Sequence, residues 1–253
     1  MEIKKAIIPA AGQGTRLGSI ARGAKELVPL VDRPAIDWII EELRNSGIDD
    51  ICVVTSPGKL EALSSHLAES HVTFAIQHHP LGLGHAVLAG REFAGEDAFV
   101  VVLPDDLFLH DQISSRLCTY TEATGRSSIA LTEVPEEIVH KYGVASGEML
   151  DGWYRIDGLV EKPEPGTQPS NLTASGRYVL TSEIWPALES TLPGRGGEIQ
   201  LTDALAELAR AGRLDGIVSR GAHHDLGSPE SWLAANIAFG AERYGKAWIS
   251  AQL

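Results

Sequence analysis

The residues best suited to bind phosphate lie near the start of the chain. A short apolar run, residues 6–8, leads directly into a glycine-rich loop that contains Gly12 and Gly14, and Arg16 follows. Small residues let a polyphosphate approach the backbone N–H groups closely. The fork of Arg16 matches phosphate oxygens, and Lys25 supplies a second cation. The segment therefore predicts a site that binds the phosphates of a nucleotide.

Other interpretations of this loop stay open at this point. A P-loop requires Gly-x-x-x-x-Gly-Lys-Ser/Thr, and the sequence contains no such run. A dinucleotide-binding loop requires Gly-x-Gly-x-x-Gly, and here Gly12 and Gly14 fit but Leu17 occupies the third glycine position. A plain strand and turn with no ligand is a further alternative, because loose glycine motifs are common.

A pair of carboxylates, Asp105 and Asp106, directly follows the apolar run at residues 99–103. A carboxylate at the carboxyl end of a buried strand is well placed to hold a magnesium ion that bridges phosphates. Pro-Asp-Asp is also favourable turn chemistry. The residues alone therefore leave a metal ligand and a simple turn as equal alternatives.

Gln77 ends another expected strand and is followed by a segment that contains Gly82. A carboxamide donates and accepts hydrogen bonds, so Gln77 could pair with the N3–H and O4 edge of uracil or thymine. Gly82 could let its backbone approach the same base. The alternative is that Gln77 is an ordinary surface residue.

Glu161 and Lys162 stand at the end of a third apolar strand. The ammonium of Lys162 suits a phosphate monoester, and Glu161 can accept hydrogen bonds from sugar hydroxyls. The alternative is an exposed ion pair, which is common and stabilises little.

The segment His223-His224-Asp225 could indicate a metal site. Adjacent histidines on an extended segment point to opposite faces, which argues against a shared zinc ion. Asp225 alone could supply a second carboxylate to magnesium, which prefers oxygen ligands. The sequence contains no Gly-x-Ser-x-Gly elbow, and neither Cys52 nor Cys118 has the surroundings of a nucleophile. Covalent catalysis therefore has no support.

Alternating strands and helices must position these residues. Apolar runs at 51–55, 72–76 and 98–103 predict strands, with helices expected over residues 34–46, 59–68 and 83–94. This order predicts an α/β fold with helices on both faces of a parallel sheet, and ligands then bind beyond the carboxyl ends of the strands. The second half is less regular, with strands expected at 128–133, 159–161 and 178–180, helices at 201–211 and 229–243, and a loop at 163–171.

Composition excludes several partners. The 253 residues include 21 basic and 34 acidic side chains, for a formal charge of −13. This balance argues against nucleic acid or an anionic membrane as the partner, so an anionic substrate needs a local basic pocket. No apolar run approaches the length of a membrane span, and two cysteines cannot build a disulfide framework. A reducing cytoplasm is the expected compartment.

Together, these segments resemble bacterial sugar-1-phosphate nucleotidyltransferases, and among them the glucose-1-phosphate uridylyltransferases. The matching segments cover nearly the whole chain and occur in the family's order: Ile8–Arg16, Lys25–Pro34, Pro80–Val87, Leu103–Asp106, Val160–Pro163, Gly176–Tyr178, Gly196–Asp203 and Asp225–Gly227.

The resemblance implies a role for each candidate residue. The loop residues Ala10, Ala11, Gly12, Gly14 and Thr15, together with Arg16, would hold the triphosphate, while Gln77 and Gly82 would read the base. Asp105 and Asp225 would hold Mg²⁺. Lys162 would bind the sugar phosphate, and Glu161, Gly143 and Gly176 would meet the sugar. Lys25 would neutralise charge near the transferring phosphorus.

The resemblance also implies the architecture and the reaction. We expect a Rossmann-like mixed, mainly parallel sheet with helices on both faces, of the nucleotidyltransferase (GT-A-like) type, in one domain, residues 1–253. Residues 1–110 would form the nucleotide-binding half, and residues 111–253 the integrated sugar-binding lobe. The expected partners are a nucleoside triphosphate and a sugar 1-phosphate, and we expect a homo-oligomer.

The predicted reaction joins UTP and glucose 1-phosphate and releases pyrophosphate. Alternatives are a thymidylyl or other nucleotidyl transferase that acts on a different sugar or cyclitol phosphate, and a non-catalytic homologue that binds nucleotide sugars. Catalytic roles are expected for Arg16, Lys25, Asp105 and Lys162. A Rossmann dehydrogenase is disfavoured by Leu17 and by the arginine in the loop.

Overall fold

A computed structural model describes residues 2–12, 14–21 and 23–251, apart from the side chains of Thr15, Arg16, Ser19 and Arg195. The strands are β1 (Lys5–Pro9), β2 (Pro29–Leu30), β3 (Arg33–Pro34), β4 (Asp50–Thr55), β5 (Thr73–Ile76), β6 (Phe99–Val102), β7 (Asp106–Leu109), β8 (Ser127–Glu133), β9 (Gly143–Met149), β10 (Tyr154–Glu161), β11 (Leu172–Leu180), β12 (Leu214–Val218) and β13 (Ala222–Asp225). The helices are α1 (Ala35–Asn45), α2 (Pro57–His66), α3 (Leu83–Ala89), α4 (Arg91–Ala94), α5 (Ile113–Thr124), α6 (Glu136–Val139), α7 (Ile184–Ser190), α8 (Leu201–Arg210), α9 (Pro229–Tyr244) and α10 (Lys246–Ser250), with 3-10 turns η1 (Thr15–Ile20), η2 (Lys25–Leu27) and η3 (Arg195–Gly197).

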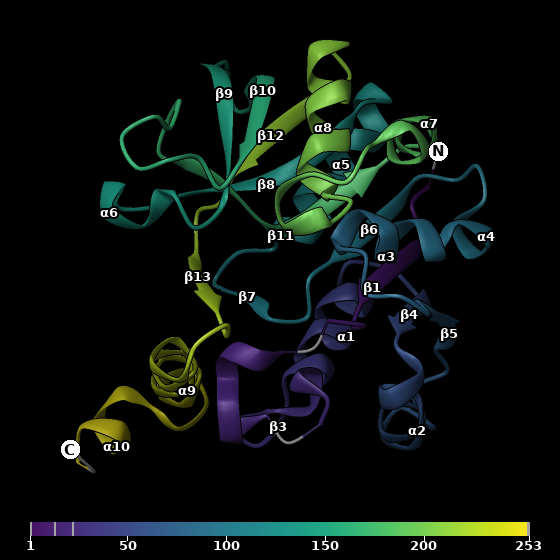
Figure 1. Ribbon diagram of the computed structural model, residues 1–253. Coiled ribbons are helices and arrows are strands. Elements are labelled where there is room, and N and C mark those ends of the chain that lie inside the picture. Colours follow the sequence, from purple (N-terminus) through teal and green to yellow (C-terminus); the bar gives the residue numbers. More distant parts are fainter. Residues whose placement is uncertain (1, 13, 22, 252–253) are drawn as a thin grey trace.

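One nine-stranded sheet, ordered β5-β4-β1-β6-β11-β8-β12-β10-β9, runs through the molecule (Figure 1). Its first four strands are parallel, through the pairs β5–β4, β4–β1 and β1–β6. The apolar runs that we expected to be buried strands form β4 and β6, and every residue of β6 is buried. The predicted α/β fold class is confirmed, and strands from both halves of the chain share this sheet.

The pairing changes in the second half of the sheet. Strand β11 runs antiparallel to β6 and β8, and β10 runs antiparallel to β9 and β12. The parallel pairing that we expected is therefore found in the first half and between β8 and β12, whereas the rest is antiparallel. A short connection explains this in part, because β9 and β10 follow one another directly and a hairpin link makes an antiparallel pair.

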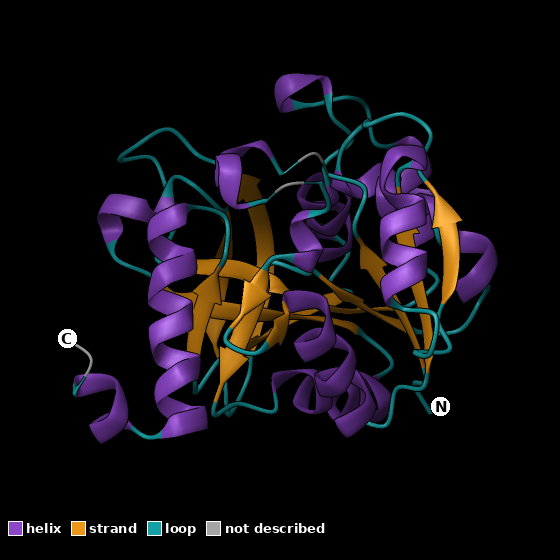
Figure 2. Ribbon diagram, turned by 90° about the horizontal axis from the view of Figure 1, so that it is seen from below, coloured by secondary structure: helices purple, strands orange, loops and turns teal. Residues whose placement is uncertain are grey.

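Two hydrophobic cores cover the two faces of the sheet. Ile8 on β1 and Val100 on β6 belong to one core, whereas their neighbours Ile7 and Val101 belong to the other. This alternation follows from the two-residue period of a strand. Helix α1 packs on the first core through the apolar face predicted from the sequence, and Figure 2 shows helices around the strands.

The helix expected over residues 83–94 is divided into α3 and α4, which meet at Gly90. A Cβ atom at Gly90 would lie 2.6 Å from Cδ1 of Ile7 on β1. The glycine therefore lets the helix backbone approach the strand closely. It also weakens the helix at this point, because glycine loses more conformational entropy than other residues.

A small two-stranded ladder brings the ends of two distant segments together. Strand β7 follows the turn after β6, and β13 pairs with it so that Asp225 lies opposite Asp106. Segment 223–225 is extended, as expected, and its two histidines do diverge: His223 Nε2 lies 2.6 Å from Asp106 Oδ1, while His224 packs against Phe239.

An ion pair with a fully buried arginine braces the turn that connects β6 to β7. Arg177 on β11 is fully buried and donates from Nε and Nη2 to the Glu42 carboxylate at 3.0 and 2.7 Å. Its Nη1 donates to Leu103 O and Gly176 O at 3.4 and 3.2 Å. Burial raises the pKa of Glu42, but Arg177 and Ser114 outweigh that effect, so the pKa is lowered and the carboxylate stays charged.

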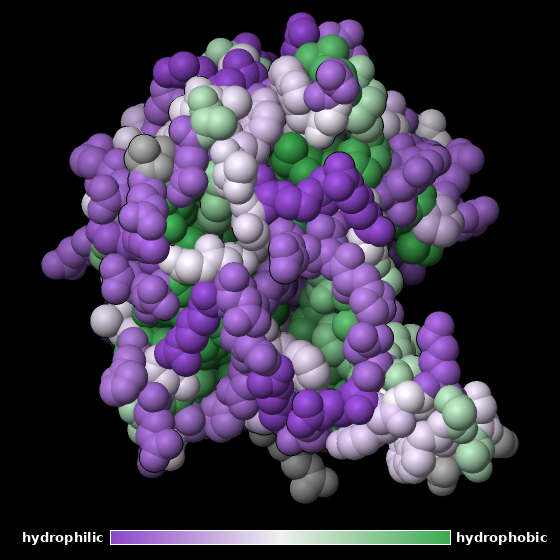
Figure 3. All heavy atoms as spheres, turned by 180° about the vertical axis from the view of Figure 1, so that it is seen from behind, coloured by the Kyte–Doolittle hydropathy of each residue, from purple (hydrophilic) through white to green (hydrophobic). Residues whose placement is uncertain are grey.

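The surface is mostly hydrophilic on the face opposite to that of Figure 1. Hydrophilic residues cover most of the face seen in Figure 3, and hydrophobic residues are visible mainly in its hollows. Within the described part of the chain, no helix combines the length and the apolar character that a bilayer crossing requires.

Substitution of the brace should be costly. Arg177→Met leaves the partly buried Glu42 carboxylate without its counter-ion, and we expect this to lower the free energy of unfolding by about 3 kcal/mol. The double variant Glu42→Leu/Arg177→Met removes both charges and should recover part of that loss. Urea denaturation of the three proteins measures the effect. A single variant within about 1 kcal/mol of the parent would show that the pair is not a structural brace.

Candidate active site

The glycine-rich loop extends from the carboxyl end of β1. Ala10 N–H donates to Val54 O at 2.7 Å, which continues the pairing with β4 for one residue beyond the strand. Gly14 has a φ of +65°, and a Cβ atom there would lie 2.8 Å from Cβ of Lys25. Only glycine fits this close approach without strain. The loop and Lys25 are therefore held against each other by backbone geometry.

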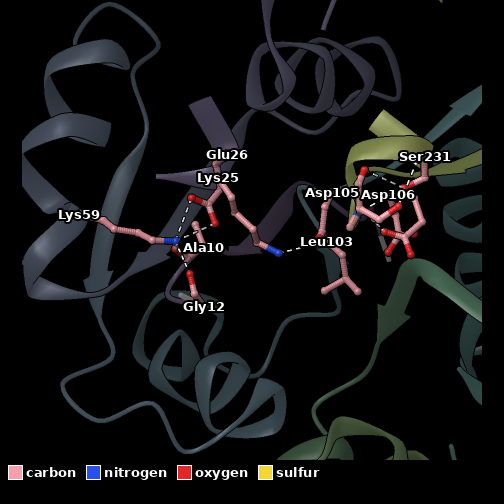
Figure 4. A network of polar contacts seen from close by, with 12 residues as sticks. Ala10, Gly12, Lys25, Glu26, Lys59, Leu103, Asp105, Asp106 and Ser231 are labelled. Carbon is pink, nitrogen blue, oxygen red and sulfur yellow. Dashed lines mark hydrogen bonds and ion pairs between the residues drawn. The ribbon is translucent and has the colours of Figure 1, made fainter. Parts of the chain in front are cut away.

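Lys25 reaches across from η2 to the end of β6. Its Nζ lies 2.5 Å from Oδ2 of Asp105 (Figure 4). Burial alone would lower the pKa of Lys25, but the nearby carboxylates, Asp105 above all, outweigh burial and raise the pKa. Lys25 is consequently a charged cation at neutral pH, placed between the loop and Asp105.

A second lysine, which the sequence analysis did not single out, lies on the other side of the loop. Lys59 on α2 donates to Ala10 O at 3.0 Å, to Gly12 O, and to both carboxylate oxygens of Glu26. Glu26 is 1% exposed, and burial raises its pKa against the opposing effect of Lys59. This network fixes the backbone of the loop from behind.

In front of the loop is a cavity of about 610 Å³, which we call the loop cavity. This volume is within the usual range for small-molecule sites. Predicted site residues on its wall are Ala11, Gly12, Gly14, Lys25, Gln77, Gly82 and Asp105. Ala10 is buried and is not part of this wall. The side chains of Thr15 and Arg16, also predicted to bind the triphosphate, lie outside the described residues.

Gln77 and Gly82 contact each other directly. The Gln77 amide nitrogen donates to Gly82 O at 3.0 Å and lies 2.9 Å from His85 Nδ1. A carbonyl oxygen only accepts, so the Gln77 atom that faces Gly82 must be the NH₂ group. Desolvation lowers the pKa of His85, which favours the neutral ring as a second acceptor. The carbonyl oxygen of Gln77 is therefore the group that suits a donor on a ligand.

A second cavity of about 460 Å³ adjoins the first, and we call it the Lys162 cavity. Gly143, Glu161, Lys162 and Asp225 line it, all of them predicted site residues. Lys162 has a φ of +45°, and its Nζ lies 2.8 Å from Oε1 of Glu161. The ion pair that we considered as the alternative therefore exists, and it lies on the wall of a cavity.

Glu161 is held in place from two directions. Its Oε2 accepts a hydrogen bond from Thr202 Oγ1 at 2.7 Å, and Gly143 is its partner in the β9–β10 register. A Cβ atom at Gly143 would lie 3.1 Å from Thr202 Oγ1 and 3.3 Å from Glu161 Oε2. A glycine at position 143 thus leaves room for this contact. Thr202 was not assigned a role from the sequence, although it lies in a segment that carried the resemblance.

Gly176 is placed behind the carboxylates rather than on a cavity wall. Its φ is +70°, and a Cβ atom there would lie 2.4 Å from Oδ2 of Asp106. Its neighbours Ala174 and Tyr178 line the Lys162 cavity instead. The role of Gly176 in meeting a sugar stays a prediction.

Asp105 lies where the two cavities meet, because it lines both of them. Asp225 is brought beside it through the hydrogen bond from Leu226 N–H to Asp105 O at 2.7 Å. Among the described residues, no three His, Cys, Asp or Glu side chains form a group that could hold a metal by themselves. Two carboxylates without a full protein cage fit Mg²⁺, which usually takes its other ligands from phosphates and water.

Comparison with known proteins gives a consistent result. The family model described as nucleotidyl transferase matches residues 5–241. The UTP–glucose-1-phosphate uridylyltransferase of Pseudomonas aeruginosa is 38% identical over 264 residues, which cover 92% of this chain and 94% of that protein.

Two solved structures have the same fold. A UDP-glucose pyrophosphorylase complexed with UDP-glucose superimposes with a TM-score of 0.88 at 35% identity, covering 95% of this chain and 100% of that one. A UTP-bound UGPase from Acinetobacter baumannii gives a TM-score of 0.85 at 34% identity, covering 98% of both chains. The glycine loop, the paired carboxylates and the two adjoining cavities agree with these matches. The matches show that the chain belongs to the nucleotidyl transferase family.

Proposed function

We propose that this chain transfers UMP from UTP to glucose 1-phosphate and releases pyrophosphate. The observation that carries the proposal is the position of Asp105 at the junction of two cavities. The loop cavity has the glycine loop and Lys25 for a triphosphate, and the Lys162 cavity has a cation for a phosphate monoester. A nucleotide in the first and a sugar phosphate in the second would meet at Asp105. The Pseudomonas aeruginosa relative is a UTP–glucose-1-phosphate uridylyltransferase, and the two solved structures contain UDP-glucose and UTP, which supports this choice of substrates.

The reaction is an in-line displacement at the α-phosphorus. A phosphate oxygen of glucose 1-phosphate forms the new P–O bond, the α–β phosphoanhydride bond breaks, and pyrophosphate leaves with the electron pair. The sugar phosphate is already ionised at neutral pH, so no strong general base is needed. The protein contributes positioning and charge neutralisation. Lys25 and Lys162 supply that charge from the two sides of Asp105, with Arg16 expected to add to it.

Nucleotidyl transferases generally use a divalent metal ion, and we propose Mg²⁺ held by Asp105 and Asp225. When bound, Mg²⁺ would neutralise phosphate charge and align the reacting groups. Asp105 contacts Lys25, and Asp225 Oδ1 accepts the Gly227 N–H at 2.6 Å. These contacts fix where the two carboxylates lie before any ligand arrives.

The base would be read by the carbonyl oxygen of Gln77. Because the NH₂ group of Gln77 faces Gly82 O and His85 Nδ1, the carbonyl oxygen is suited to accept the N3–H of uracil. Thymine carries the same N3–H, whereas cytosine has an acceptor at N3. The arrangement therefore favours uracil and thymine over cytosine.

Two further proposals concern the protein as a whole. A homo-oligomer is supported by the exposed apolar residues Leu233 and Ile237 on α9 and Trp248 on α10. The nucleotide half and the sugar half meet within one sheet, so we propose that they act as one domain. A cytoplasmic location stays a prediction.

Pyrophosphate release tests the proposed function. The protein is incubated with each of the four nucleoside triphosphates and thymidine triphosphate, against a panel of sugar 1-phosphates and Mg²⁺. We expect the fastest release with UTP and glucose 1-phosphate, and no release without the sugar phosphate. No activity with any pair would contradict the assignment.

Loss of either metal carboxylate should reduce turnover without unfolding the chain. We expect Asp105→Asn and Asp225→Asn each to lower kcat at least about a hundredfold, because neutral amides hold Mg²⁺ poorly. Asp97→Asn, an exposed aspartate that pairs with Lys5, is the matched control and should retain full turnover. Near-normal turnover in either site variant would remove that carboxylate from the site.

Gln77→Ala should weaken the choice of base. We expect a higher KM for UTP and reduced discrimination against CTP and purine triphosphates, because the base would lose its polar partner. Gln168→Ala, in the exposed loop after β10, is the control. Initial rates with each triphosphate give the result. Unchanged selectivity would mean that Gln77 does not read the base.

Lys162 and Arg16 should control different substrates. Lys162→Ala should weaken binding of glucose 1-phosphate roughly ten- to a hundredfold and leave UTP binding nearly unchanged, since each charge-assisted contact is local. Arg16→Ala should do the reverse. Calorimetric titration of each variant with each ligand measures both affinities. Equal losses for both ligands in both variants would show that the cations act as one shared cluster.

A further inference from the structure

Lys59 is a buried cation that touches the glycine loop from the side away from the ligand cavities. Lys59 is 8% exposed. The described residues that line the loop cavity and the Lys162 cavity do not include it. Figure 4 shows the Lys59 ammonium directed at Ala10, Gly12 and Glu26, whereas the Lys25 side chain extends away from Lys59 toward Asp105. Lys59 therefore cannot act by touching the triphosphate from this position.

Several hydrogen-bond acceptors converge on this one ammonium. Lys59 Nζ lies 3.0 Å from Ala10 O and 3.0 and 3.1 Å from the two Glu26 carboxylate oxygens, and it also donates to Gly12 O. Oxygens gathered this closely repel one another unless a cation lies between them. Without Lys59, the two carbonyl groups would have to turn away from Glu26.

The direction of those carbonyl groups sets the direction of the loop's donors. In a planar trans peptide, the N–H points opposite to the C=O of the same unit. Because Ala10 O points at Lys59, the N–H of Ala11 points away from Lys59, and Ala11 lies on the wall of the loop cavity. An anion in that cavity is bound by N–H groups and repelled by carbonyl oxygens.

The ion pair with Glu26 acts on a different segment. Glu26 lies in η2 directly after Lys25, and Lys25 is already held against the loop by the close approach of Gly14 and by its contact with Asp105. The hydrogen bonds from Lys59 to Ala10 O and Gly12 O, rather than its ion pair, therefore bear on the direction of the loop's carbonyl groups.

We propose that Lys59 is a positioning residue for triphosphate binding, which turns the carbonyl groups of Ala10 and Gly12 away from the loop cavity and thereby presents the Ala11 N–H to the phosphates. The proposal rests on the proposed function, since it assumes a triphosphate in the loop cavity. The alternative is that Lys59 only neutralises the buried Glu26 and stabilises the fold. The two roles differ in which substitutions are expected to lower the affinity for UTP.

Three variants separate these roles. Glu26→Gln removes the ion pair but leaves the contacts of Lys59 with the loop carbonyls. Lys59→Met removes both, and leaves the Glu26 carboxylate buried without its counter-ion. Glu26→Met/Lys59→Met removes the loop contacts but no longer buries an unpaired charge, so its stability should recover relative to Lys59→Met. UTP and glucose 1-phosphate are titrated separately by calorimetry, and stability is measured by urea denaturation.

If Lys59 has a positioning role, UTP affinity should fall in every variant that lacks its hydrogen bonds to the loop, whether or not that variant is less stable than the parent. We expect Glu26→Gln to bind UTP within about threefold of the parent, and both variants that lack Lys59 to bind it about ten- to a hundredfold more weakly. Glucose 1-phosphate affinity should stay unchanged in all three. Parent-like UTP affinity in the double variant would overturn the proposal, as would a loss in Glu26→Gln equal to that in Lys59→Met.

A matched lysine provides the control. Lys5 also bridges a backbone carbonyl and a carboxylate, Ala94 O at 3.1 Å and Asp97 at 2.7 Å, but lies outside both cavities. Lys5→Met should leave UTP affinity unchanged. If the parent protein itself does not bind UTP, the proposed function fails; if the parent binds UTP and the double variant binds it equally well, the positioning role fails.

Discussion

Each described cation of this site is held beside a carboxylate, and the rest of the site is built around those pairs. Lys25 lies against Asp105, Lys59 against Glu26, and Lys162 against Glu161. A protein with a formal charge of −13 offers no general attraction for anions, so it must place positive charge locally. Lys25 and Lys59 are largely buried, and a buried charge is costly unless it is paired, whereas Lys162 is exposed and its pair with Glu161 lies on a cavity wall.

The sheet brings these pairs together. Strand β1 ends at the glycine loop, Asp105 follows shortly after the end of β6, and β10 ends at Glu161, so three strand ends supply the loop and two of the carboxylates. The ladder of β7 and β13 then adds Asp225 opposite Asp106. The ion pair of Glu42 and Arg177 supports this junction from the other side, through the carbonyl groups of Leu103 and Gly176. The same contacts that pack the sheet therefore also position the residues of the candidate site.

The fold could be predicted from the sequence where hydrophobic patterns are simple. Strands β4 and β6 are unbroken apolar runs, and α1 places its apolar residues on one face. Strand β12 was missed because its sequence contains Asp215 and Gly216. Asp215 is buried with Arg126 and Tyr120, and a Cβ atom at Gly216 would lie 2.3 Å from Leu131 Cδ1. Only tertiary contacts explain these residues in a strand.

The residues of the candidate site likewise fall into those that the sequence could predict and those that it could not. Residues in short motifs, such as Gly14, Asp105 and Lys162, could be found because their types and spacing suggest phosphate chemistry. Lys59 could not, because a lysine within a helix indicates a solvated side chain unless its partner is known. That partner, Glu26, is 33 positions away, and Arg177 is 135 positions from Glu42. Sequence spacing carries no information about such contacts.

The loop cavity and the Lys162 cavity meet at Asp105, so one product molecule should extend through both. A crystal structure of the protein with UDP-glucose and Mg²⁺ would show whether it does. We expect the uracil beside Gln77, the glucose beside Glu161, and the α-phosphate next to Asp105. A nucleotide sugar bound wholly within one cavity, with its phosphates away from Asp105, would show that the two cavities do not hold the two substrates.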